Sequence, residues 1–460
     1  MDNQTIYALS TVYGKSGVAV IRISGKDALA AVSRLTPLDV SGLKPRYAYF
    51  TNIYDSVSRE TLDKCLLLYF KAPASFTGED IVEFQIHGSR AVIASLMENL
   101  GRLKNFRLAE PGEFSRRAFY NGKMDLTEAE GLADLIDSET SEQQKYAMRQ
   151  MEGGLKNLYD GWREELIKIL AYMEAYIDFP DEDIPQELVD KLLNDVFKLQ
   201  TAIDLHLKGD AVGERLREGF RVVIVGPPNA GKSSLLNAVV NRDAAIVSAV
   251  AGTTRDAVDV HLDIKGYPVI LLTAKQAVED PVMFTDTAGI REVEEEIEKQ
   301  GIEIAFRKIA DADLVLCLFD ASKDSVQIFD NIKNSFKNKA IFVANKSDNL
   351  TFEQCSELKK QGCVVISAKQ KEGIAALMDV ICQQIRGRFT SNSGLLISRR
   401  RYREALEETS ENLRRFGFDK EIELAAEDIR LAARALGRIT GRIEVDDILN
   451  KIFDSFCIGK

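Results

Sequence analysis

One glycine-rich stretch constrains the fold of this chain more than any other part of it. The stretch at residues 226–234 contains the pattern G-x-x-x-x-G-K-[ST], after an apolar run at residues 222–225 and before a helix-like run at residues 235–240. In this strand–loop–helix context the pattern is typical of a phosphate-binding loop, because its glycines let several N–H groups converge on one anion. We expect Lys232 to reach the β- and γ-phosphates and the Ser233 hydroxyl to bind Mg²⁺.

Two further elements contain residues suited to the γ-phosphate and its metal ion. Residues 252–256 supply Thr254, which we expect to bind Mg²⁺ as part of a switch loop that orders only with a γ-phosphate. Residues 286–289 supply Asp286 and a glycine N–H. We expect Asp286 to hold Mg²⁺ through water and the N–H to meet the γ-phosphate.

The last two elements predict which base is bound. Residues 345–348 follow an apolar run, and Asp348 is expected to accept both N–H groups on one edge of guanine, an edge that adenine lacks. Asn345 and Lys346 are expected to brace the base and the loop, and residues 367–369 to support the base through their backbone. The predicted GTP-binding residues are Asn229, Ala230, Gly231, Lys232, Ser233, Ser234, Ser248, Ala249, Val250, Ala251, Gly252, Thr253, Thr254, Asp286, Thr287, Ala288, Gly289, Asn345, Lys346, Asp348, Ser367, Ala368 and Lys369.

These five elements predict a GTPase, but one usual side chain is missing from it. Ile290 follows the element at residues 286–289, at a position where many GTPases have a glutamine that orients water. An isoleucine cannot orient water, so hydrolysis needs its charge and its water-positioning group from elsewhere. Asn229 is a candidate ligand for a monovalent cation, and an equal alternative is that it only caps the loop.

Composition excludes several classes of protein. The 460 residues are 45% hydrophobic and 28% charged, which is ordinary for a soluble globular chain with several domains. A net charge of −11 argues against a protein that coats nucleic acid nonspecifically. Six cysteines without paired spacing and three histidines make a structural zinc site unlikely and fit a reducing, cytoplasmic setting. We find no signal-peptide pattern and no run long enough to span a membrane.

The periodicity of apolar residues predicts three domains. Residues 1–122 predict a mixed α/β domain, with strands at residues 17–23, 65–70 and 81–86 and a helix at residues 91–103. Residues 215–389 contain the nucleotide elements and predict an α/β GTPase domain. Residues 123–214 and 390–460 have helical periodicity, including a long apolar stripe from Met151 to Ile177. We therefore predict a GTPase domain inserted into a discontinuous all-α domain, preceded by an α+β domain.

The hydrophobic pattern alone indicates no functional role for Arg22, for Glu83 or for the last four residues. Arg22 and Glu83 lie in strand-like runs and favour a solvated sheet face. The last four residues, 457–460, favour a frayed tail.

The chain resembles a known family in six short segments that together span its length: residues 22–25, 75–80, 111–115, 177–180, 228–232 and 457–460. They are similar to segments of the MnmE/TrmE family of tRNA wobble-uridine modification GTPases. The resemblance implies an N-terminal domain like folate-binding aminomethyl-transfer domains, which forms a homodimer and binds 5-formyltetrahydrofolate or a related one-carbon folate. Family positions near that ligand match Arg22, Glu83, Lys123 and Lys460, and a cysteine that the family needs for modification matches Cys457.

The resemblance also supplies the groups missing from the nucleotide site. The K⁺-binding positions of the family match Asn229, Ser248, Val250 and Thr253, and its water-orienting acid matches Glu298. The cation would offset charge that develops in the transition state. With a flavin-dependent partner of the MnmG/GidA type, in a heterotetramer, the family builds aminomethyl or carboxymethylaminomethyl groups on U34 of tRNA.

The chain departs from the family pattern at one place. Residues 269–272 predict the strand that precedes Asp286, but residues 273–281 intervene before a second strand-like run at residues 282–285. We expect a surface excursion that leaves GTP binding intact, because loop length costs little. These intervening residues lie beside the switch that contains Asp286. The timing of the switch and the geometry of the dimer therefore do not follow directly from the family pattern.

A second interpretation uses the same nucleotide site. A regulatory GTPase switch in ribosome assembly would need neither Cys457 nor Lys460 nor the N-terminal folate pattern. It would favour an appended basic RNA-binding module, and the sequence has no G-X-X-G loop in a basic context. A folate-binding assay separates the two interpretations.

Overall fold

The computed structural model describes residues 4–178, 185–208, 212–240, 260–273, 311–326, 339–389 and 395–443, together with residues 452, 453, 456 and 459. Contacts divide the chain into a first unit (residues 1–133, 150–183 and 418–460) and a second unit (residues 134–149 and 184–417). Helices α4 (Leu126–Ile136) and α5 (Ser141–Met151) each cross a boundary between these units. The predicted boundaries of the three domains stay a prediction.

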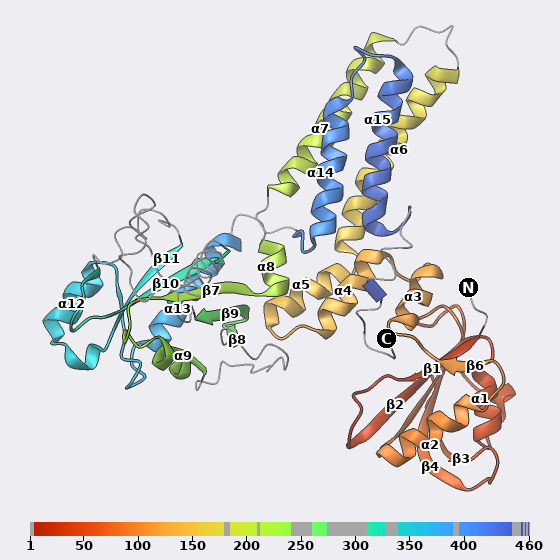
Figure 1. Cartoon of the computed structure of the whole chain (residues 1–460). Helices are drawn as coiled ribbons and strands as arrows, with labels where there is room; N and C mark the ends of the chain where they lie inside the picture. Colours follow the sequence, from red (N-terminus) through yellow and green to blue (C-terminus); the bar gives the residue numbers. More distant parts are fainter. Residues whose placement is uncertain are drawn as a thin grey trace, which may run out of the picture. The chain divides into compact units, whose positions relative to one another are not determined.

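A six-stranded sheet forms the N-terminal part of the first unit (Figure 1). Its order is β3-β4-β5-β2-β1-β6, and β1 and β6 are its one parallel pair. Alternate residues of β2, namely Ala19, Ile21 and Ile23, are buried against helices α1 and α2, while Arg22 lies on the other face. The elements are β1 (Thr5–Leu9), β2 (Ser16–Ser24), α1 (Ala28–Leu35), a 3₁₀ turn (Val40–Gly42), β3 (Tyr49–Tyr54), β4 (Thr61–Phe70), β5 (Ile81–Gly88), α2 (Arg90–Gly101), β6 (Phe106–Leu108) and α3 (Glu113–Tyr120).

A pair of long helices forms the rest of the first unit. Helix α6 (Gly154–Asp178) buries Leu155, Leu166, Ile169 and Met173, and it packs along α15 (Ile422–Thr440), whose buried face is rich in alanine. Small residues let two helix backbones approach closely. The apolar stripe predicted from Met151 to Ile177 lies along α6, except for Met151, which ends α5 before the chain turns at Gly153, where φ is 84°. Most of the last part of the predicted helical periodicity, after residue 443, lies outside the described residues.

A second six-stranded sheet forms the centre of the second unit, in the order β12-β11-β10-β7-β9-β8. All its pairs are parallel except β8 with β9, and β7 lies between β10 and β9. Helices α9 and α13 contribute to the larger of its two apolar cores. The elements are α8 (Val212–Glu218), β7 (Phe220–Val225), α9 (Lys232–Val240), β8 (Val260–Ile264), β9 (Tyr267–Thr273), β10 (Leu314–Asp320), β11 (Ala340–Asn345), a 3₁₀ turn (Ser347–Asn349), α12 (Phe352–Lys360), β12 (Val364–Val365) and α13 (Ile374–Phe389).

Helices on either side of this sheet in the sequence lie together in the structure. Helix α7 (Gln186–Leu207) precedes the sheet and α14 (Arg400–Arg415) follows it, and the two pack side by side (Figure 1). Asp204 of α7 accepts hydrogen bonds from Ser410 Oγ at 2.5 Å and from Arg414 Nη2 at 3.0 Å. The predicted insertion of an α/β domain between helical segments is therefore confirmed. None of the described helices is both long and apolar enough to cross a membrane.

Candidate active site

The phosphate-binding loop follows β7 and opens α9, as the sequence predicts. Lys232 Nζ donates to the carbonyl oxygens of Gly226 at 2.7 Å and Pro227 at 3.0 Å, so the cation lies over the loop backbone. Ser233 and Ser234 are exposed in the first turn of α9. The positive end of this helix and the lysine together suit a phosphate.

The loop can have this shape only because two of its residues lack a side chain. A Cβ on Gly226 would lie 2.0 Å from Leu318 O, and one on Gly231 would lie 2.3 Å from Asn345 Nδ2. Gly231 also has a φ of 98°, which favours glycine. Asn229 is exposed and has a φ of 62°, a conformation that asparagine tolerates better than most residues.

Asn345 joins the phosphate loop to the base-binding segments. Its Nδ2 donates to Ala230 O at 2.7 Å, and its Oδ1 accepts from Ala368 N–H at 3.0 Å. The residue is 2% exposed, so both contacts are shielded from water. One side chain at the end of β11 thereby holds the predicted phosphate and base elements in one place.

Asp348 and Ser367, predicted as base contacts, lie against each other. Ser367 Oγ donates to Asp348 Oδ1 at 2.6 Å. This hydrogen bond is the main cause that lowers the pKa of Asp348 below its ordinary value, with smaller contributions from the charges of Lys369 and Lys346. The carboxylate is therefore ionised at neutral pH and acts only as a hydrogen-bond acceptor.

Lys346 contacts a residue that the sequence analysis did not single out. It has a φ of 64°, and its Nζ lies 2.6 Å from Asp320 Oδ2 at the end of β10. Burial alone would raise the pKa of Asp320, but hydrogen bonds from Lys346 and Ser322 hold it below its ordinary value. The sequence offered one sign of this contact, since Asp320 is an acidic residue at the end of an apolar strand. The ends of parallel strands meet at one edge of a sheet, where a nucleotide site is expected.

Several predicted residues lie outside the described part of the chain, and their roles stay predictions. They include the metal-binding and water-orienting residues of the switch segments and two residues of the C-terminal tail: Ser248, Ala249, Val250, Ala251, Gly252, Thr253, Thr254, Asp286, Thr287, Ala288, Gly289, Glu298, Cys457 and Lys460. The strand-like run at residues 282–285 lies outside it as well, whereas β9 confirms the strand predicted at residues 269–272.

In the first unit, Arg22 and Glu83 form a partly buried ion pair. They are opposite each other on β2 and β5, and Arg22 Nε lies 2.8 Å from Glu83 Oε1. Their side chains are 24% and 15% exposed, so the interpretation as a solvated sheet face is wrong for this pair. The Arg22 guanidinium carbon also lies 5.7 Å from the ring centre of Phe76 and 5.8 Å from that of Phe114.

Lys123 and Gly459 bring two further segments toward the same strands. Lys123 Nζ donates to Pro73 O at 2.9 Å, in the loop that carries Phe76. Ser10 Oγ donates to the backbone oxygen of Gly459 at 3.0 Å, and Gly459 is buried, so this one described residue of the predicted frayed tail is packed against β1. Ser10 follows β1, whose Ala8 lies opposite Arg22.

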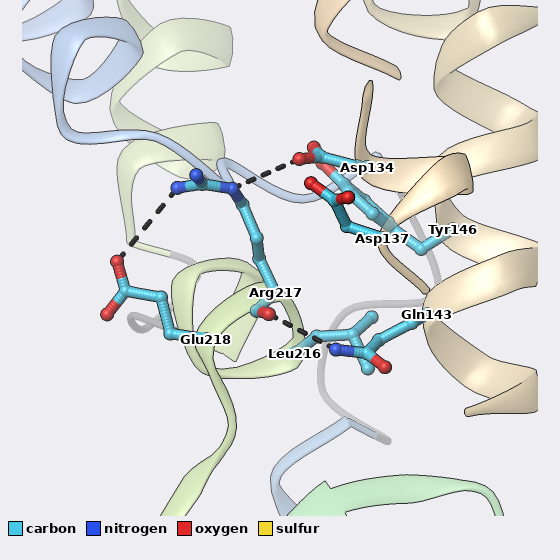
Figure 2. Close-up of a pocket in the computed structure, with 7 residues that line it drawn as sticks. All are labelled: Asp134, Asp137, Gln143, Tyr146, Leu216, Arg217 and Glu218. Carbon is cyan, nitrogen blue, oxygen red and sulfur yellow. Dashed lines mark hydrogen bonds and ion pairs between the residues drawn. The ribbon is translucent and has the colours of Figure 1, made fainter. Parts of the chain in front are cut away.

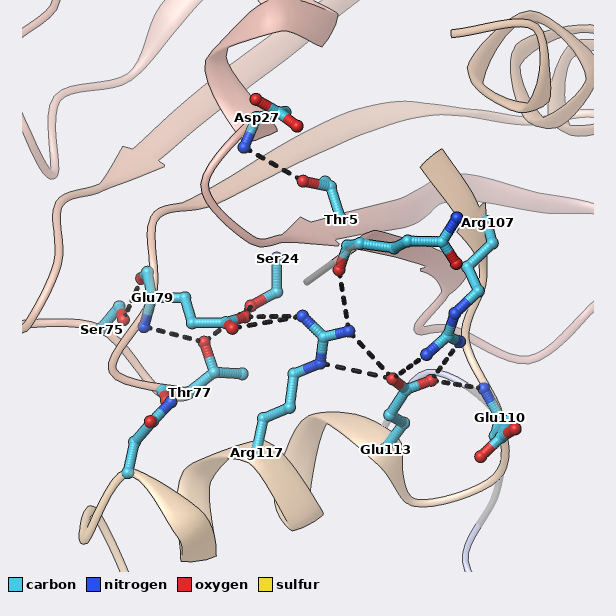
Figure 3. A network of polar contacts seen from close by, with 12 residues as sticks. Thr5, Ser24, Asp27, Ser75, Thr77, Glu79, Arg107, Glu110, Glu113 and Arg117 are labelled. Atoms are coloured by element: carbon cyan, nitrogen blue, oxygen red, sulfur yellow. Dashed lines mark hydrogen bonds and ion pairs between the residues drawn. The ribbon is translucent and has the colours of Figure 1, made fainter. Parts of the chain in front are cut away.

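A buried polar network holds the loop at residues 71–80 against α3 (Figure 3). Arg117 Nη1 lies 3.0 Å from Glu79 Oε2, and Arg117 Nη2 lies 3.0 Å from Glu113 Oε1. Glu113 also accepts two hydrogen bonds from Arg107, each of 2.7 Å. Sequence reasoning quoted the segments of Glu79 and Glu113 for their resemblance but assigned these residues no role.

The second sheet and its site define a class of protein. A mostly parallel sheet with a phosphate-binding loop after β7, and with Asp348 and Asn345 after β11, is a P-loop GTPase. Two family models match the chain, the MnmE helical domain over residues 126–457 and the GTP-binding protein TrmE N-terminus over residues 5–123. The chain belongs to the family of tRNA modification GTPases named MnmE.

Individual relatives agree over the full length. The tRNA modification GTPase MnmE of Paramagnetospirillum magneticum is 45% identical over 462 residues, covering 100% of both chains. That of Parvibaculum lavamentivorans is 46% identical over 464 residues, covering 99% of this chain and 100% of its own. That of Rickettsia typhi is 42% identical over 462 residues, covering 99% of this chain and 100% of its own.

Proposed function

We propose that this GTPase modifies the wobble uridine of certain tRNAs. With a flavin-dependent partner of the MnmG/GidA type, it adds an aminomethyl or carboxymethylaminomethyl group to C5 of U34. The proposal is supported by membership of the family and by full-length relatives named tRNA modification GTPase. The observation that best supports GTP as the bound nucleotide is the position of the Asn345 side chain. It links Ala230 of the phosphate loop to Ala368 of the predicted base site.

Hydrolysis in this proposal depends on groups that polarise the phosphates and on groups that place water. Ser233 and Thr254 would hold Mg²⁺, with Asp286 acting through water, and Glu298 would orient the attacking water. Asn229, Ser248, Val250 and Thr253 would hold K⁺. Two of these proposed ligands, Ser233 and Asn229, lie in the described part of the chain. Both are exposed and offer oxygen atoms, the ligands that hard cations such as Mg²⁺ and K⁺ prefer. When bound, the two cations supply positive charge against the charge that develops on the phosphates.

The first unit would bind the one-carbon donor, 5-formyltetrahydrofolate or a related folate. Arg22, Glu83, Lys123 and Lys460 are the proposed contacts. Arg22 supplies a cation near two aromatic rings, a combination suited to a ligand with carboxylates and a flat ring system. The folate would supply a one-carbon unit to the modified uridine.

The proposed assembly follows the family. Two copies of the chain associate through their N-terminal domains, and the flavin-dependent partner completes a heterotetramer in the cytoplasm. tRNA is the macromolecular substrate of this assembly.

Replacing Cys457 tests the proposal that the tail serves modification and not hydrolysis. We expect Cys457→Ser to leave GTP turnover within about twofold of the parent while 5-substituted U34 disappears from tRNA. Both are measured with purified protein, partner and tRNA, and Cys355→Ser, in a different part of the chain, is the control. Loss of both activities would show that the tail acts on the nucleotide site, and retention of both would remove Cys457 from the reaction.

A further inference from the structure

The turn between β8 and β9 rests on the start of helix α5. Glu142 N–H donates to Gly266 O at 3.1 Å. Gly266 has a φ of 93°, and a Cβ at this position would lie 2.5 Å from Ser141 Oγ. This approach requires glycine, because any other residue would be strained and too close. A displacement of the turn therefore either carries the start of α5 with it or breaks this contact.

The hairpin that ends in this turn lies between two predicted switch segments of the chain. β8 begins at Val260, after residues 252–256, and β9 ends at Thr273, before residues 286–289. β9 also pairs in parallel with β7, the strand that leads into the phosphate-binding loop. Segments that order around a γ-phosphate change conformation between the two nucleotide states. Both ends of the β8–β9 hairpin are therefore attached to segments that are predicted to respond to the nucleotide.

One turn further along, α5 contacts the segment that leads into α14. Tyr146 Oη donates to Leu396 O at 2.7 Å, and this hydrogen bond is buried. Tyr146 and Leu396 also share a small apolar cluster with Val212 and Leu216 of α8. Because a buried carbonyl that loses its donor is costly, this bond ties the entry of α14 to the position of α5.

An ion-pair arrangement and a cavity lie beside these contacts (Figure 2). The Asp134 carboxylate is shared by Arg217 of α8 at 3.1 Å and by Arg399, directly before α14, at 2.8 Å. Gln143 of α5 donates to Arg217 O at 3.2 Å. The cavity of about 260 Å³ is lined by α5, α8 and the residues around Asp134. This space is open to solvent, so α5 and α8 are not close-packed against each other here and have room for a second arrangement.

We propose that α5 passes the nucleotide state of the GTPase site to the helix pair of α7 and α14. A movement of the β8–β9 hairpin displaces the start of α5 through the hydrogen bond between Glu142 and Gly266. Helix α5 in turn displaces the segment before α14 through the hydrogen bond of Tyr146. The proposal rests on the nucleotide site that underlies the proposed function and adds a regulatory route out of that site. It requires two arrangements of α5, one for each nucleotide state.

Hydrogen exchange on the full-length protein tests this route. We expect backbone amides of residues 396–403 to exchange at different rates with GDP and with a non-hydrolysable GTP analogue. In Tyr146→Phe, which keeps the ring and removes the donor, the ratio of the two rates should fall by about fivefold, the usual worth of one hydrogen bond. Tyr120→Phe removes a hydroxyl from a tyrosine that is 45% exposed and serves as the control.

Gly266→Ala tests the other end of the route. It should reduce the same exchange ratio while the dissociation constants for GDP and the analogue stay within twofold of the parent. The proposal is wrong if the parent shows no nucleotide-dependent difference at residues 396–403, or if Tyr146→Phe keeps the full difference. Weakened nucleotide binding in both variants would also overturn it, because α5 would then support the site itself. No tRNA is present in these measurements. Their outcome therefore does not depend on whether the protein modifies tRNA.

Discussion

At the scale of single residues, Asp348 is the residue that we propose selects the base in the nucleotide site. Ser367 donates to one carboxylate oxygen at 2.6 Å and keeps the pKa of Asp348 low. An ionised carboxylate only accepts hydrogen bonds, and guanine offers two donors on one edge. The orientation and the charge of this side chain are therefore both set before a nucleotide binds.

Replacing Asp348 by asparagine should change the preferred base. An amide offers a donor in place of one acceptor, so we expect GTP affinity to fall by about 100-fold while xanthosine triphosphate gains. Titrations with GTP, ATP and xanthosine triphosphate measure this change. Asp311→Asn, on the exposed surface of the same unit, should leave all three affinities unchanged. An unaltered GTP preference in Asp348→Asn would place base recognition elsewhere.

A second residue, Asp125, makes stability depend on pH. Its Oδ1 accepts from Thr127 Oγ1 at 2.9 Å and from Glu128 N–H at 2.8 Å at the start of α4. Burial, the largest influence, raises the pKa of Asp125 from 3.8 to about 6. Between these two values the folded state binds more protons than the unfolded state, so stability falls as pH rises through this window.

Asp125→Asn should therefore stabilise the protein at pH 8 and not at pH 4. The amide oxygen can keep both hydrogen bonds, and the cost of a buried charge, about 3 kcal/mol at most, is removed. Denaturant unfolding at several pH values between 4 and 8 measures the difference from the parent. A gain that is the same at every pH would show that the carboxylate's charge is not the cause.

At the scale of elements, a few buried side chains hold loops against helices. Arg117 of α3 is 7% exposed and connects Glu79 of the loop at residues 71–80 with Glu113 of its own helix. Although burial alone would raise the pKa of Glu113, hydrogen bonds from Arg107 and Arg117 hold it below its ordinary value. The same loop carries Phe76, whose ring lies against Arg22.

Arg117→Ala should destabilise the first unit by roughly 2–3 kcal/mol, because Glu79 loses its ion-pair partner and the buried Glu113 keeps only Arg107. Folate affinity should fall with it, since the loop that carries Phe76 loses its anchor. Denaturant unfolding and a folate titration check the two effects. The neighbouring Arg116, which pairs with the exposed Glu110, is the matched control, and Arg116→Ala should cost less than about 1 kcal/mol. Equal effects of both variants would contradict the importance of the buried network.

Sequence patterns predicted the elements well but not the contacts between them. Strand-like runs predicted β2 and β4, alternation predicted β5, and the glycine pattern predicted the loop before α9, because these signals are local. Arg22 and Glu83 are far apart in sequence, and only the register of β2 against β5 makes them partners. The contact of Asn345 with Ala230 likewise depends on two separate strands ending at one edge of the sheet.

At the scale of the whole molecule, the order of elements along the chain connects the nucleotide-binding sheet to helical segments at both of its ends. Helices α7 and α14 pack together although the whole nucleotide-binding sheet lies between them in the sequence. An inserted domain is attached at both of its ends, so a rearrangement near the nucleotide acts on both attachments at once. The residues of the proposed one-carbon site that the structure describes belong to the other unit.

Mass spectrometry of tRNA nucleosides from cells that lack this protein tests the central claim most directly. We predict that 5-aminomethyl-type uridines at position 34 disappear, return when the parent gene is restored, and do not return with Asp286→Ala. If the modified uridines persist without the protein, its GTPase site serves another process, and a regulatory switch becomes the better account.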